Sequence, residues 1–137
     1  MKGLLISYLF FQILIPNYVL ANDKHCGLIS LNEGNEDIEM HFEIPKKNQQ
    51  IKVLFKVMDK NITEIQDLFY CVLKEKHIHC SGDDDGGDFN LYLEEKLLSI
   101  SRIGSGNPDL KRIELKPIKK KPFKYIDCSV LRKAAEK

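Results

Sequence analysis

The sequence predicts an all-β fold: a small antiparallel β-barrel or sandwich of about seven or eight short strands. Apolar and polar residues alternate with period two in several segments, which is typical of half-buried strands. Turn-forming residues separate these segments at short intervals, most clearly at 104–108 (Gly-Ser-Gly-Asn-Pro). No alternation of strands and helices resembles that of a nucleotide-binding fold. The chain therefore reads as one sheet-rich body.

The clearest strand covers residues 37–44, where four apolar side chains share one face and polar side chains share the other. Residues 64–73 also fit a helix by composition, but the strands around them favour a strand. Ser129 precedes helix-forming residues, so we expect it to cap a short C-terminal helix over 129–136. The remaining expected strands are 51–58, 65–73, 77–80, 89–93, 97–103, 110–115 and 122–127.

Residues 1–21 are typical of a cleavable secretory signal peptide. Lys2 supplies the positive start, an apolar region follows, and Ala21 ends a segment of the kind that signal peptidase reads. The uninterrupted apolar stretch 4–11 is too short to span a membrane. We therefore expect residues 22–137 to form a single β domain, secreted or periplasmic, monomeric and without a membrane anchor.

Four cysteines lie in the expected mature part, and an even number in a small exported chain favours two disulfides. Sequence alone allows three pairings. We favour Cys71–Cys80, because this pair is symmetric about a two-residue loop at 75–76, as cross-strand partners in a hairpin are. Cys26–Cys128 would then tie the two ends of the domain together and contribute roughly 4 kcal/mol.

Charge is balanced overall but not along the chain. Residues 22–95 hold 8 Lys/Arg against 16 Asp/Glu, a net of −8, whereas residues 96–137 hold 12 against 4, a net of +8. Two interpretations stay open: the halves neutralise each other across neighbouring strands, or one basic face binds an anionic partner. Pairing across strands is the simpler of the two.

An acidic, glycine-rich segment follows Cys80. Its aspartates, Asp83, Asp85 and Asp88 among them, suggest a calcium site, because calcium prefers carboxylate and carbonyl oxygens. The fit to an EF-hand loop fails, since Asp88 stands where glycine is required. The alternative is a tight turn in which Gly86-Gly87 adopt positive φ and the aspartates are solvated. We expect no other cofactor.

The same segment resembles an uncharacterised family of small exported bacterial proteins. The family motif is a cysteine, two residues, an acidic residue, a second cysteine, then Asp-Gly-Gly-x-Phe. Asp84 replaces the second cysteine here, so the resemblance implies no disulfide pairing. It implies a secreted or periplasmic location and no activity. The matching residues are Cys80, Asp83, Asp85, Gly86, Gly87 and Phe89.

A basic segment lies near the C-terminus, where two prolines keep the chain extended. It offers a patch for phosphate, an acidic glycan or an acidic protein, although the lack of arginine and the few aromatics argue against nucleic acid. The simpler interpretation is an edge strand whose lysines and prolines prevent sheet extension. The five lysines are Lys116, Lys119, Lys120, Lys121 and Lys124.

Three functions remain in order. The first is a non-enzymatic protein-binding module of the inhibitor or host-directed effector type, because neither a Gly-x-Ser-x-Gly elbow nor a distinctive acid pair is present. The second is a calcium- or metal-stabilised envelope protein, and the third is a small hydrolase. Asn61-Ile62-Thr63 is in addition an N-glycosylation sequon, relevant in a eukaryotic secretory pathway.

Overall fold

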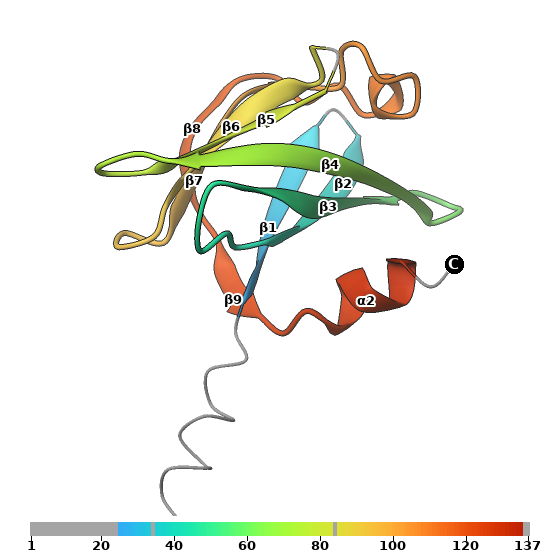
Figure 1. Cartoon of the computed structure of the whole chain (residues 1–137). Coiled ribbons are helices and arrows are strands. Elements are labelled where there is room, and N and C mark those ends of the chain that lie inside the picture. The colour runs from blue at the N-terminus through green and yellow to red at the C-terminus, as the bar shows by residue number, and fades with distance from the viewer. Residues whose placement is uncertain (1–24, 34, 84, 136–137) are drawn as a thin grey trace, which may run out of the picture.

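The computed structural model describes residues 25–33, 35–83 and 85–135. The predicted signal peptide, residues 1–21, lies outside them. Nine strands, one 3-10 helix and one short α-helix make up the described chain (Figure 1). The strands are β1 (Cys26–Glu33), β2 (Glu36–Glu43), β3 (Gln49–Met58), β4 (Thr63–Leu73), β5 (Ile78–Gly82), β6 (Gly87–Tyr92), β7 (Leu97–Ile103), β8 (Ile118–Pro122) and β9 (Lys124–Ile126).

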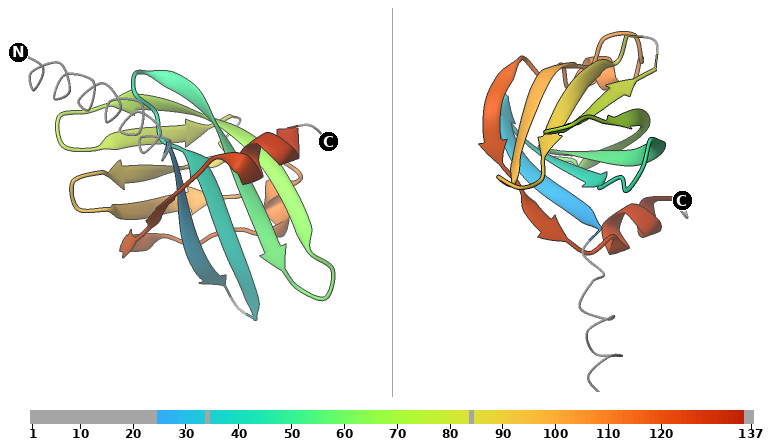
Figure 2. Two further views of the ribbon diagram at one scale, coloured as in Figure 1. Left: turned by 90° about the horizontal axis from the view of Figure 1, so that it is seen from below. Right: turned by 60° about the vertical axis from the view of Figure 1, so that its left-hand side comes forward.

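The strands form one antiparallel sheet in the order β8-β7-β6-β5-β4-β3-β2-β1-β9. Each of the first eight pairs with its chain neighbour, and β9 returns to pair with β1. β8 also approaches β1, because Lys121 and Ser30 line one surface hollow and the Phe42 and Phe123 rings lie 5.5 Å apart. The sheet thus curls into a nearly closed barrel, which confirms the predicted fold class (Figure 2).

Aromatic rings fill the middle of the barrel. Phe69 and Phe89 meet edge to face with centroids 5.1 Å apart, and Phe42 lies 6.2 Å from Phe89. All three rings are fully buried, together with the alternate apolar residues of β2 and β3. Period-two alternation places these side chains inside, as the sequence predicts.

Three elements differ from expectation. The predicted strand 110–115 is wrong: Leu110–Arg112 form a 3-10 helix, η1, and a single bridge joins Leu115 to Ile103. Leu110 and Ile113 are both buried, and their spacing of three suits a helical turn better than a strand. Strand β1 was not predicted, whereas β8 confirms the edge-strand interpretation of the lysine segment.

The short C-terminal helix is confirmed as α2 (Ser129–Ala135). Its expected cap is wrong, since the Asp127 carboxylate accepts the Ser129 N–H at 2.8 Å. Hydrogen bonds from Ser129 hold the pKa of Asp127 below its usual value. No helix in the described part of the chain is both long and apolar enough to cross a membrane.

Helix α2 covers part of the outer surface of the barrel. Leu131 packs there against Leu54 of β3 and Cys26 of β1, and the Cys26–Cys128 disulfide fastens the start of the helix. Figure 2 shows α2 lying across the outside of β2 and β3. This small second core makes His41, the cross-strand partner of Leu54, a buried residue.

His41 is buried without a hydrogen-bond partner at either ring nitrogen in the described residues. Its Nε2 lies 3.5 Å from Oε1 of Glu39, a long ion-pair contact. Burial lowers the pKa of His41, and the nearby Glu39 carboxylate opposes that shift only in part. The neutral imidazole is therefore the form that the native state favours.

Acidification is expected to weaken the fold through His41. Because the folded pKa lies below the unfolded value near 6.5, the unfolded chain binds the proton more tightly, and stability falls as pH drops below that value. One proton limits the slope to about 1.4 kcal/mol per pH unit. Urea unfolding of wild type and His41→Leu between pH 7 and 5 measures the effect. An equal slope in both proteins would contradict this assignment.

Candidate functional site

A pocket of about 710 Å³ opens at the end of the barrel where β2 meets β3, β4 meets β5 and β6 meets β7. These three connections lie together on the left side of Figure 1. The mouth of a β-barrel is a common place for a ligand or partner site, and this volume lies within the range of such sites. The pocket is therefore the candidate functional site.

The pocket combines an apolar wall with a charged rim. The apolar lining consists of Ile44, Pro45, Leu73, Ile78, Leu91 and Leu93. The rim carries both signs of charge, from Lys46, Lys74, Glu75, Lys76, Glu94 and Glu95, and adds His25, His77 and Tyr92. Such a surface suits an apolar group that enters the pocket and polar groups that remain around it.

Backbone hydrogen bonds hold the connections around the pocket. The Leu73 N–H donates to the side-chain oxygen of Asn48 at 2.8 Å, which joins the β2–β3 connection to β4. The Lys74 N–H donates to the His77 carbonyl at 2.8 Å and closes the predicted two-residue hairpin loop. The site is therefore formed before anything binds, which reduces the entropy cost of binding.

The Cys71–Cys80 disulfide lies directly below the pocket. These cysteines are cross-strand partners in β4 and β5, and Leu73 and Ile78, two residues closer to the barrel end, line the pocket. Both predicted disulfides are thus confirmed. Because the disulfide and the aromatic core fill the barrel beneath, the pocket is limited to the mouth.

The predicted lysine patch meets the pocket at one residue. Lys120 Nζ lies 4.2 Å from the centre of the Tyr92 ring and 3.4 Å from a Glu95 carboxylate oxygen, while His77 stacks on Tyr92 with centroids 5.5 Å apart. All five lysines of the patch are exposed, but they follow an edge strand and do not form one cluster around the pocket.

The acidic and basic parts of the chain pair at two places. Lys120 contacts Glu95, and Arg112 lies 3.5 Å from Asp59. Both contacts join the acidic N-terminal part to the basic C-terminal part, as the interpretation of mutual neutralisation predicts. Each pair is exposed, so its contribution to stability is small.

The three predicted calcium ligands do not face one another. Asp83 and Asp85 are exposed in the β5–β6 turn, whereas Asp88 lies on β6 with Oδ2 3.7 Å from Nε2 of His79. Within 25–33, 35–83 and 85–135, no group of three or more His, Cys, Asp or Glu is placed to hold a metal ion. Asp84 is outside the described residues, and calcium binding stays a prediction.

The turn interpretation of this segment is correct in its main point. Gly87 has φ +96° and Asp85 has φ +59°, whereas the expected positive φ at Gly86 is not observed. The turn docks on the β7–η1 connection, because the Gly104 N–H donates to the Gly86 carbonyl and the Ser105 hydroxyl donates to the Asp85 carbonyl. The glycines thus serve the backbone.

Asp67 is a residue that the sequence analysis missed. It occupies the inward face of β4 between Ile65 and Phe69, and its Oδ2 has no hydrogen-bond partner in the described chain. Burial raises its pKa, and the charges of Asp83 and Asp109 add to that shift. The detectable signal was a carboxylate at an apolar position of an otherwise alternating strand.

The chain matches no protein-family model, no curated protein and no solved structure. The resemblance to small exported bacterial proteins therefore stays a prediction. Two disulfides and a barrel are the features on which the function must be argued, and the disulfides are consistent with an oxidising, extracellular environment.

Proposed function

We propose that this chain is a secreted or periplasmic, non-enzymatic binding module that holds a partner protein at the open end of the barrel. The pocket carries the proposal. An apolar side chain of the partner fills it, while the rim charges select the partner by complementary charge. The inhibitor or host-directed effector type fits this mode of action.

The shape of the site favours a protein over a deeply enclosed ligand. The aromatic core and the Cys71–Cys80 disulfide occupy the barrel below the mouth, so only a short apolar group can enter. Three connections surround that entrance and supply polar contacts over a wider area than the pocket itself. A buried anchor within a polar rim is the usual anatomy of a protein interface.

Two leucines of strand β4 provide a matched pair of variants. Leu73 lines the pocket and is 41% exposed, while Leu68 is 40% exposed and points away from the barrel interior. Leu73→Lys places a charge in the pocket and is expected to weaken partner binding at least about tenfold. Leu68→Lys adds the same charge to the same strand and leaves the pocket intact.

The measurement is affinity capture with the wild type and both variants from an extract of the source organism, followed by titration with the protein captured. The proposal expects one partner that wild type and Leu68→Lys retain and Leu73→Lys loses. Equal retention by Leu73→Lys, or no partner on the wild type, would overturn it. Thermal unfolding of each variant verifies that the fold is intact.

The pocket volume also favours a second candidate, a carrier of a small apolar molecule. An environment-sensitive apolar dye separates the two. Saturable dye binding that Leu73→Lys abolishes, in a protein that captures no partner, would support the carrier and not the binding module.

A further inference from the structure

We infer that Asn61 is an N-glycosylation site and that its glycan covers the tip of the β3–β4 turn. Asn61-Ile62-Thr63 is the only Asn-x-Ser/Thr sequence in the chain. The site lies at the end of the barrel away from the pocket, on the right side of Figure 1. It is thus independent of the proposed binding site.

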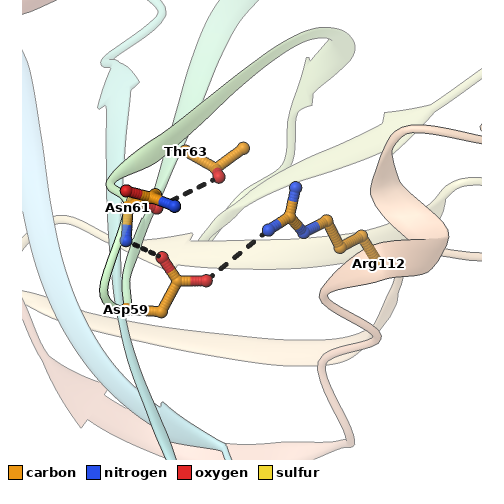
Figure 3. A network of polar contacts seen from close by, with 4 residues as sticks. All are labelled: Asp59, Asn61, Thr63 and Arg112. Atoms are coloured by element: carbon orange, nitrogen blue, oxygen red, sulfur yellow. Dashed lines mark hydrogen bonds and ion pairs between the residues drawn. The ribbon is translucent and has the colours of Figure 1, made fainter.

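The turn presents the Asn61 side chain freely. Asn61 is exposed, and its side-chain amide has no hydrogen-bond partner in the described part of the chain. The backbone is held instead: Asp59 accepts the Asn61 N–H at 2.9 Å, and the Thr63 hydroxyl donates to the Asn61 carbonyl at 3.3 Å. Figure 3 shows these contacts.

The far side of the turn is fixed to the body of the protein. Arg112 of η1 lies 3.5 Å from the Asp59 carboxylate that also accepts the Asn61 N–H (Figure 3). The acceptor amide therefore stands on a defined turn and does not compete with a structural contact. A bulky glycan can be attached there without breaking any hydrogen bond that holds the fold.

Exposed apolar side chains flank the acceptor. Ile62 is 62% exposed and Met58 is 42% exposed, two of the five large apolar residues with such exposure in the described chain. Apolar groups at a turn tip are an aggregation risk when they are left bare. A hydrophilic glycan on Asn61 would shield both, which gives these positions a reason to remain apolar.

The chemistry is a glycosyl transfer. The side-chain nitrogen of Asn61 bonds to the anomeric carbon of an oligosaccharide that is carried on a polyprenyl diphosphate. The bond from that carbon to the diphosphate oxygen breaks, and the polyprenyl diphosphate leaves with the electron pair. A base of the transferase takes the amide proton. The Thr63 hydroxyl is the part of the sequon that the transferase recognises.

The test expresses the full chain in a eukaryotic secretory cell line. Intact mass is measured in the medium and the cells, before and after treatment with a glycan-releasing amidase. We expect a gain of about 2 kDa or more that the amidase removes, converting Asn61 to aspartate. Asn61→Gln and Thr63→Ala are expected to abolish the gain, while Thr63→Ser and Asn48→Gln retain it.

Each outcome decides the inference. A secreted chain without the mass gain overturns glycosylation and leaves the exported location standing, whereas a chain that is neither secreted nor glycosylated overturns both. A gain that persists in Asn61→Gln assigns the modification to another residue and overturns the site. Because the Asn61 amide makes no structural contact, circular dichroism of Asn61→Gln should match the wild type.

Discussion

Replacing Cys26 and Cys128 together with alanine is expected to lower the free energy of unfolding by about 5 kcal/mol. The disulfide joins residues 102 positions apart, so it closes nearly the whole domain into one loop. In the chain-entropy model, a cross-link stabilises mainly by restricting the unfolded chain, and more so for a longer loop. A loss of this size approaches the entire stability of a typical small domain.

The second disulfide provides the comparison. Cys71 and Cys80 are only 9 positions apart, so the same model assigns their bridge about 3 kcal/mol. Urea unfolding without reductant should give the Cys26→Ala/Cys128→Ala protein a lower midpoint and a steeper dependence on urea, because its unfolded state expands further. A loss below about 2 kcal/mol would contradict the entropic account.

Limited proteolysis adds a local readout. The Cys26–Cys128 bridge holds α2 and β9 against the barrel, where few other contacts retain them. Without it, a protease should cut first within residues 124–135. The alanine variant of the other pair should keep this segment protected, because its lesion lies beneath the pocket.

Gly87→Ala is expected to destabilise the protein by about 3 kcal/mol. Gly87 has φ +96°, a conformation that side chains rarely adopt. A methyl group there would also overlap the Arg102 carbonyl oxygen and lie 2.7 Å from the Ile103 Cα. Both obstacles belong to the backbone of β7, so neither can be removed by a rotamer change.

Gly82→Ala is the matched control for this effect. Gly82 lies in the same turn, and an added Cβ would meet only the edge of the Phe69 ring, at 3.2 Å. We expect a change within about 1 kcal/mol. Urea unfolding compares the two, and equal losses would refute the claim that Gly87 is required by the backbone. A large difference would account for one glycine of the Asp-Gly-Gly segment without invoking calcium.

The sequence predicted the parts of the fold that local geometry determines. The symmetry of Cys71 and Cys80 about a two-residue loop gave the hairpin register, because such a loop leaves one pairing of the flanking strands. Alternation identified β2 and β3 because each has one face in the core. η1 was misread because Ile113 and Leu115 are two apart, as in a strand, whereas Leu110 and Ile113 determine the actual packing.

The candidate site was beyond the reach of local patterns. Its walls come from four separate segments, at 25, 44–46, 73–78 and 91–95, which only the closed barrel brings together. His41 was likewise expected on the polar face of β2, because the period of a strand carries no information about a helix that docks later. Both cases depend on contacts between residues far apart in the chain.

The consecutive order of β1 to β8 has a consequence for the route of folding. Every pairing among them joins chain neighbours, so each requires only a short loop closure and can form rapidly. The pairing of β1 with β9 must instead wait until the meander has curled round and its ends meet. In oxidative refolding, the hairpin bridge should therefore mature early and the terminal bridge last, sealing a barrel that is already assembled.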